Sequence, residues 1–180
     1  MACSCVTTGW RGRCSIAASG RTPYVVGGIK FAKEKGATTS CITTSLNSIL
    51  ANTVDYPIEV VTGAEAITGS TRMKSGTAQK LVCNMLTTAS MIKMGKVYEN
   101  LMIDMQPTNE KLVARAEKMV MEITGLTQEE AKEYIKKYGN VKKSIFAFLT
   151  GIENIDEIDE YLEKSKGNIR LALKLAKGEE

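Results

Sequence analysis

The sequence predicts an α/β domain built on a parallel sheet, followed by a small all-helical module. Between Arg13 and Val61, short apolar or β-branched runs alternate with helical patterns, which is typical of parallel strands joined by helices. After Thr71 apolar residues recur at helical spacing, and after Gly125 a helix-turn-helix pattern occurs twice. The 180 residues, 43% of them hydrophobic, are enough for one such domain and an accessory module.

Three segments have the composition of buried strands, because they are short, apolar or β-branched, and bounded by turn residues. They are Cys14–Ala18, Thr38–Thr43 and Ile58–Val61.

Three helices are predicted around these strands. Thr22 is suited to cap the first, Pro23 fits its first turn and Gly36 follows its last lysines. A second, shorter helix is predicted over Ser48–Val54. The longest helical pattern runs over about Thr71–Met94 and predicts a core helix.

The C-terminal third reads as helices separated by glycine turns. A helix over about Thr108–Ile123 ends at Gly125, where we place a domain boundary. The tail opens with a capping box at Thr127. It then repeats a helix, a Gly-Asn turn and a second helix, with the turns at Gly139 and Gly167.

Charge and composition exclude several classes of function. The net charge of +4 is spread along the chain, and the densest basic run (Lys136, Lys137, Lys142, Lys143) reads as a solvated helix surface, so we expect no nucleic-acid partner. The chain has no histidine, which excludes Ser-His-Asp and Cys-His catalysis and every metal site that needs histidine.

The cysteines and the hydropathy pattern predict a cytoplasmic protein. The odd number of five cysteines argues against a disulfide framework, and only Cys3 and Cys5 lie close together in the sequence. No apolar run approaches the roughly 18 residues that a membrane span needs, so we expect no membrane partner.

A polar loop follows the first predicted strand and leads into the first helix. Ser19 and Thr22 can donate hydroxyl hydrogen bonds, Gly20 lets the backbone come close to a ligand, and Arg21 adds positive charge. Because a helix N-terminus favours an anion, the loop is suited to phosphate, although an ordinary strand-helix turn would look similar.

A second polar cluster, Gly63–Lys74, follows the third predicted strand. Ligands of open α/β sheets bind beyond the carboxyl ends of the strands, so both clusters are expected on one rim. Ser70 and Thr71 could instead be helix caps, with Arg72 a surface charge. Glu65 is the carboxylate placed to orient a sugar hydroxyl or to move a proton.

Several motifs resemble those of the N-acetylmuramic acid 6-phosphate etherases, a family with the SIS (sugar isomerase) fold. Four stretches carry the resemblance, in the same order as in that family. They are Ile16–Val25, Thr68–Lys80, Gly95–Tyr98 together with Asn100–Met102, and Pro107–Val113.

The resemblance implies a lyase of bacterial cell-wall sugar recycling that acts as a cytoplasmic homodimer without a cofactor or metal. Such enzymes cleave the D-lactyl ether of N-acetylmuramic acid 6-phosphate, giving N-acetylglucosamine 6-phosphate and D-lactate. The elimination across C2 and C3, followed by water addition, needs one group to remove the C2 proton and another to protonate the departing oxygen.

The resemblance also implies the domain limits and the site. Residues 1–14 do not match the family, residues 15–125 resemble part of the SIS domain, and residues 126–180 resemble its small UBA-like, three-helix domain. The family's two acid/base glutamates precede the matching part, so we expect a truncated and inactive sugar-binding domain. The residues implied to bind substrate are Ser19, Gly20, Arg21, Thr22, Glu65, Ser70, Thr71 and Arg72.

Two alternatives to an etherase remain open. The first is a regulator of the same fold that binds sugar phosphates without turning them over. The second is a structural remnant that has lost binding. Thr68–Lys80 favours etherase ancestry, whereas the absent glutamates favour inactivity. We also expect the Cys14–Ala18 strand to lack a neighbour on one side.

Overall fold

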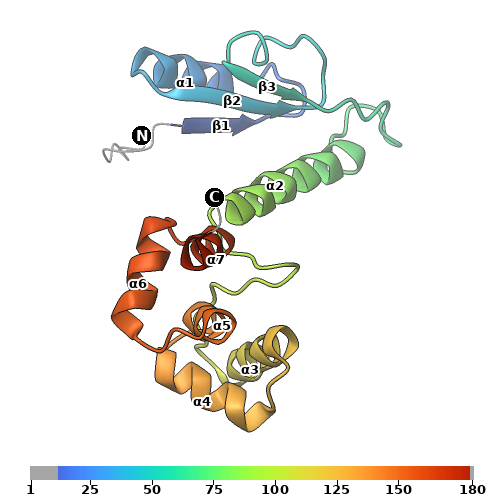
Figure 1. Cartoon of the computed structure of the whole chain (residues 1–180). Coiled ribbons are helices and arrows are strands. Elements are labelled where there is room, and N and C mark those ends of the chain that lie inside the picture. The colour runs from blue at the N-terminus through green and yellow to red at the C-terminus, as the bar shows by residue number, and fades with distance from the viewer. Residues whose placement is uncertain (1–11, 179–180) are drawn as a thin grey trace. The chain divides into compact units, whose positions relative to one another are not determined.

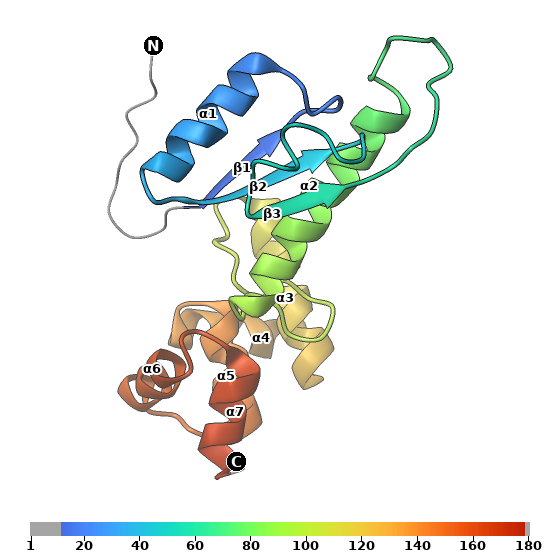
Figure 2. The same ribbon diagram turned by 90° about the horizontal axis from the view of Figure 1, so that it is seen from above.

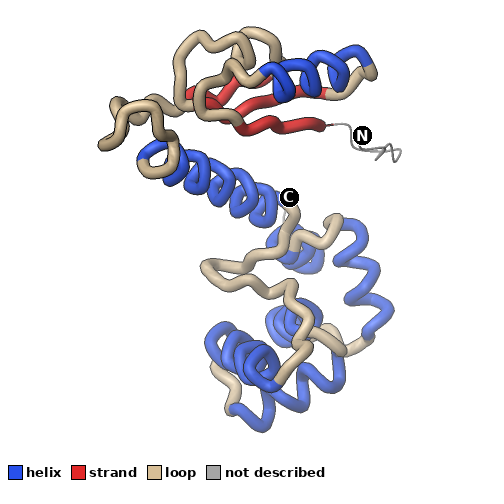
Figure 3. Tube along the Cα trace, turned by 180° about the vertical axis from the view of Figure 1, so that it is seen from behind, coloured by secondary structure: helices blue, strands red, loops and turns tan. Residues whose placement is uncertain are grey.

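The structure, a computed structural model, describes residues 12–178. Within this range the chain forms three strands and seven helices. It divides into a first unit that ends at Leu86 and a second that begins at Thr87, and Figure 3 shows the strands confined to the first. Most of the non-matching segment 1–14 lies outside the described residues, and the predicted domain limits stay a prediction.

The first unit contains a parallel sheet, which confirms the predicted fold class. Its strands lie in the order β1 (Gly12–Ile16), β2 (Thr38–Thr43) and β3 (Tyr56–Glu59). Strand β2 has the predicted bounds, whereas β1 and β3 begin and end two residues earlier than predicted. Among residues 12–178, β1 is an edge strand, as expected.

Helix α1 (Pro23–Glu34) lies on one face of the sheet, and the first half of α2 (Lys74–Lys93) lies on the other (Figures 1 and 2). Proline occupies the first turn of α1 and Thr22 is its N-cap residue, as predicted, but the Thr22 side chain makes no capping hydrogen bond. Ile29 of α1 and Cys41 of β2, both almost fully buried, belong to one small core.

The helix predicted over Ser48–Val54 is wrong, because this segment forms a series of turns. The Leu50 N–H donates to the Gly20 carbonyl (2.9 Å) and the Asp55 N–H donates to the Thr39 carbonyl (3.1 Å). Two helix-like bonds lie within the segment, from the Asn52 N–H to the Ser48 carbonyl and from the Val54 N–H to the Leu50 carbonyl, but they do not extend into a regular helix. Leu50 is fully buried, so the apolar pattern that suggested a helix does mark a packed segment.

Helix α2 is not the core helix that the sequence predicts. Its buried residues are Ser75 and Val82. Leu81, Met85 and Leu86, which continue the apolar pattern, are 44 to 61% exposed. The apolar periodicity therefore identified a helix correctly but not its environment in this chain.

The second unit packs five helices around one core. They are α3 (Glu110–Thr124), α4 (Gln128–Tyr138), α5 (Val141–Thr150), α6 (Ile155–Lys164) and α7 (Ile169–Lys177). Val120, Phe146 and Ile158 are among its fully buried residues. Residues 126–178 thus contain four helices, where the resemblance implies three.

The helix boundaries of the second unit follow the sequence signals closely. The capping box at Thr127 is present, with the Thr127 and Glu130 side chains each accepting the other residue's N–H. The two Gly-Asn turns are alike: Asn140 caps α5 and Asn168 caps α7 through their side chains. The internal repeat is therefore confirmed at the level of its turns.

Two of the clustered lysines differ from the predicted solvated surface. The Lys142 side chain is only 12% exposed; it donates to the Gly167 carbonyl (3.0 Å) and lies near Asp104. Lys143 forms an ion pair with Asp159 at 2.6 Å.

No helix within residues 12–178 has the length and apolar character needed to cross a membrane.

Candidate functional site

The loop after β1 turns at Gly20, where the backbone has a φ of 60°. A β-carbon at this position would overlap the side chain of Ser48 and lie 3.0 Å from the Thr43 hydroxyl oxygen. The loop after β1 therefore meets the residues after β2 at a point where only glycine fits.

The loop after β1 also carries three polar side chains at its surface. Ser19, Arg21 and Thr22 are exposed. Within the described part of the chain, no hydrogen bond or ion pair engages any of the three side chains. Two hydroxyls and a guanidinium thus stand beside the N-terminus of α1, where the helix dipole favours an anion.

The carbonyl of Ala18 joins this loop to the end of β2. Its oxygen accepts the Thr44 N–H (3.0 Å) and the hydroxyls of Thr43 (3.0 Å), Thr44 (3.1 Å) and Ser45 (3.2 Å). Four donors from three consecutive residues therefore converge on one oxygen, immediately before Ser19.

Thr44 also connects the first loop to the second polar cluster. Its hydroxyl lies 3.0 Å from the Ser75 hydroxyl, in the first turn of α2. The Ser75 N–H in turn donates to Glu65 Oε1 at 3.0 Å. A chain of hydrogen bonds therefore runs from Ala18 through Thr44 and Ser75 to Glu65, along the edge where the strands end.

The Glu65 carboxylate closes the N-terminus of α2. Oε1 accepts the Ser75 N–H, and Oε2 accepts the Lys74 N–H at 3.1 Å. These backbone bonds lower the pKa of Glu65, which makes its carboxylate a weak proton acceptor. Because Glu65 already occupies this helix N-terminus, the N-terminus of α1 is the one left open to a ligand.

Ser70, Thr71 and Arg72 lie in the loop that precedes α2. Since α2 begins at Lys74, neither Ser70 nor Thr71 caps it; the Ser70 hydroxyl oxygen only accepts the Arg72 N–H, at 3.5 Å. Thr71 and Arg72 are exposed, and no interaction engages their side chains among residues 12–178. Their donors are therefore available to a ligand, and none of them forms a hydrogen bond with Ser19–Thr22 in the part of the chain that the structure describes.

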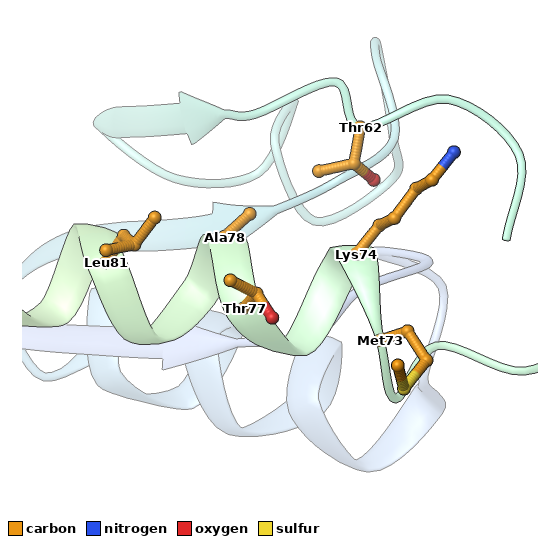
Figure 4. A pocket seen from close by; sticks show the side chains of 6 residues that line it. All are labelled: Thr62, Met73, Lys74, Thr77, Ala78 and Leu81. Atoms are coloured by element: carbon orange, nitrogen blue, oxygen red, sulfur yellow. The ribbon is translucent and has the colours of Figure 1, made fainter.

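An open groove of about 480 Å³ lies beside the start of α2 (Figure 4). Its lining is mostly apolar and consists of Thr62, Met73, Lys74, Thr77, Ala78 and Leu81. The Lys74 ammonium donates to the Ala64 carbonyl at 2.8 Å and so fixes one wall. None of the predicted binding residues lines this groove, so the chemistry favours the polar rim over the groove.

Sequence reasoning missed Thr43, Thr44, Ser45 and Ser75. A run of hydroxyl residues directly after a parallel strand is a signal that could have found the first three. It also missed Glu59, the last residue of β3. Glu59 Oε1 is buried and has no hydrogen-bond partner within residues 12–178, which is unusual for a carboxylate.

Comparison with known proteins gives consistent results. The SIS domain family model matches residues 15–89. A protein of an Exiguobacterium species named N-acetylmuramic acid 6-phosphate etherase is 53% identical over 159 residues, covering 88% of this chain and 54% of the relative. A protein of the same name from Clostridioides difficile is 51% identical over 89% of this chain and 53% of its own length. Another, from Mesorhizobium japonicum, is 50% identical over 88% of this chain and 52% of its own length. The chain thus spans about half the length of the curated relatives it matches.

Proposed function

We propose, from the premise that the chain is a partial homologue of the N-acetylmuramic acid 6-phosphate etherases, that it binds a sugar phosphate as part of such an etherase. Its SIS domain match covers residues 15–89. The proposed substrate is N-acetylmuramic acid 6-phosphate. The proposed reaction is a carbon-oxygen lyase reaction that eliminates D-lactate across C2 and C3 of the sugar and then adds water, which leaves N-acetylglucosamine 6-phosphate.

In this proposal the loop after β1 holds the phosphate. Ser19 and Thr22 donate hydroxyl hydrogen bonds, Arg21 supplies charge, and Gly20 gives the ligand access to the backbone. The observation that carries the proposal is the hydrogen-bond chain from Ala18 to Glu65, which ties this loop to the second cluster. It supports a single site along the strand ends.

The second cluster forms the other wall of the proposed site. Arg72 and the hydroxyls of Ser70 and Thr71 supply further donors for the sugar. Glu65 fixes the start of α2 through its two backbone contacts and so holds Ser75 and Thr44 in place.

Catalysis needs a proton acceptor near C2 of the sugar and a proton donor near the ether oxygen. Glu65 is the candidate that the sequence offers, but both of its oxygens are engaged and its pKa is lowered. This observation favours the second candidate function, a sugar-phosphate-binding protein of the same fold that does not turn its ligand over.

We further propose a cytoplasmic homodimer with a small-molecule ligand, and no nucleic acid or membrane partner. The exposed apolar side chains of Leu81, Met85 and Leu86 on α2 support association, since apolar surface of this kind is usually covered in soluble proteins. Analytical ultracentrifugation of the purified chain tests this, and a monomer at all concentrations would contradict it.

Calorimetric titration tests the proposed binding. The full chain is titrated with N-acetylglucosamine 6-phosphate and, in parallel, with N-acetylglucosamine. We expect N-acetylglucosamine 6-phosphate to bind and N-acetylglucosamine not to bind. Arg21→Ala should weaken the binding of the phosphorylated sugar roughly tenfold or more, because a charged hydrogen bond is lost. D-lactate release from N-acetylmuramic acid 6-phosphate then separates the two candidates: turnover supports the etherase, and binding without turnover supports the non-catalytic protein.

A further inference from the structure

The Ala18 carbonyl oxygen has more donors than it can bind at full strength. It lies within 3.2 Å of one backbone N–H and three hydroxyls. A carbonyl oxygen has two lone pairs, so it accepts two good hydrogen bonds. Two of the four donors are therefore surplus, and their identity follows from the alternatives open to each.

Two donors are committed to Ala18. The Thr44 N–H belongs to the backbone and cannot turn away. The Thr43 side chain is fully buried, so releasing its hydroxyl would leave a buried donor without a partner. Its oxygen also accepts the Ser45 N–H at 3.3 Å, which fixes its position further.

Thr44 and Ser45 contribute the surplus hydroxyls, but they differ in their alternatives. The Thr44 hydroxyl has a second acceptor, Ser75 Oγ at 3.0 Å. The Ser45 hydroxyl has only Ala18 as an acceptor within residues 12–178. Ser45 is also half-buried, so solvent or a ligand can reach it.

We propose that Ser45 is a further ligand-binding residue, whose hydroxyl turns from the Ala18 carbonyl to donate to a sugar phosphate bound at Ser19–Thr22. The inference rests on the proposed function and deepens it by adding a donor from the β2 end. Turning costs little, because the Ala18 oxygen keeps Thr43 and the Thr44 N–H. The donor is near the ligand, because the Ala18 carbonyl belongs to the peptide bond that leads into Ser19.

The test compares Ser45→Ala with Ser40→Ala by calorimetric titration of the full chain with N-acetylglucosamine 6-phosphate. Ser40 is a matched control, since it is also a half-buried serine of the same strand-loop segment but lies within β2, and its hydroxyl is 3.5 Å from the Arg13 carbonyl. Ser45→Ala is expected to weaken binding about tenfold with an unchanged melting temperature. Ser40→Ala is expected to bind like the unaltered chain.

The outcomes separate this inference from the function on which it rests. If the unaltered chain binds the sugar phosphate and Ser45→Ala binds equally well, the role of Ser45 is overturned. A weaker affinity together with a clearly lower melting temperature also overturns it, because Ser45 would then support the fold. If the unaltered chain does not bind sugar phosphates at all, the proposed function itself fails, and the inference fails with it.

Discussion

Gly20 and Ser48 approach so closely that no β-carbon fits between them, although 28 positions separate them in the sequence. The contact joins the loop after β1 to the turns after β2. Since Gly20 also has a positive φ, both space and backbone conformation require glycine at the centre of the candidate site.

Replacement of Gly20 by alanine should therefore be strongly destabilising. The added methyl group must displace Ser48 or Thr43 in a backbone conformation that alanine disfavours, at a cost of about 2 to 4 kcal/mol. Urea unfolding measures the change. Gly27→Ala is the control: Gly27 lies inside α1 with nothing near its β-carbon position, so alanine should raise stability by about 0.5 to 1 kcal/mol. Equal effects of the two substitutions would contradict the close approach.

Replacement of Glu65 by glutamine should lower the melting temperature at neutral pH. The folded-state pKa of Glu65 is lowered, chiefly by the backbone N–H groups of Ser75 and Lys74, so its stabilising effect is present above the unfolded-state pKa near 4.5. It is lost as the pH falls below that value, because the carboxylate is then protonated. Scanning calorimetry from pH 3 to 7 should show the two proteins converging at the acid end. A difference that persists at low pH would show that charge is not the cause.

Asp55 should also stabilise the first unit above its unfolded-state pKa and lose this effect in acid. Its oxygens contact Lys33 Nζ (2.8 Å), the Thr39 N–H (2.9 Å) and the Thr39 hydroxyl (2.8 Å). The Lys33 contact is the first of the causes that lower the pKa of Asp55 to about 2. Stability is therefore present above the ordinary pKa near 3.8 and is lost as the pH falls through about 2.

Thermal unfolding of Asp55→Asn at several pH values measures this effect. The variant should melt below the unaltered chain at pH 7, and the difference should shrink between pH 4 and pH 2. Glu160→Gln is the control, since Glu160 forms an exposed pair with Lys164 on one helix and should change little. An Asp55→Asn variant as stable as the unaltered chain at pH 7 would contradict the assigned contacts.

Gly95 should be required for the packing of the second unit. A β-carbon there would overlap the backbone of Asn168, the residue that caps α7. Gly95→Ala is compared with Gly125→Ala in urea unfolding, because both positions have a positive φ but Gly125 faces open space. Both substitutions cost about 1 kcal/mol through the backbone, and Gly95→Ala should cost about 1 to 3 kcal/mol more. Equal costs would exclude the overlap as a cause.

The sequence predicted the elements whose signals are local. The bounds of β2, the capping box at Thr127 and the two Gly-Asn turns each depend on residues a few positions apart. The helix predicted over segment 48–54 is wrong for the opposite reason, since the Leu50 N–H leaves the segment to bond the Gly20 carbonyl and Asp55, directly after it, bonds to β2. The exposure of Leu81 on α2 was also beyond local reasoning, because helical spacing shows a face but not what covers it.

The same distinction between local and long-range signals applies to the candidate site. The loop Ser19–Thr22 could be located from a strand end and a helix start. The contact of Thr44 with Ser75 could not, because 31 positions separate them and neither residue is unusual in its own segment. The role of Glu65 as the carboxylate at the start of α2 required the structure for the same reason: the backbone groups it accepts lie nine and ten positions away.

Because Cys41 is buried in the small core beside α1, the reactivity of its thiol can report local unfolding of the first unit. Burial raises the pKa of the Cys41 thiol and keeps alkylating reagents away, so this thiol should be modified only when the sheet and α1 separate. All five cysteines precede residue 87, so the second unit contributes no thiol. The rate at which the Cys41 thiol is alkylated, followed by mass spectrometry of the peptide that contains it, therefore measures how often the sheet opens. Opening of the second unit does not contribute to this rate.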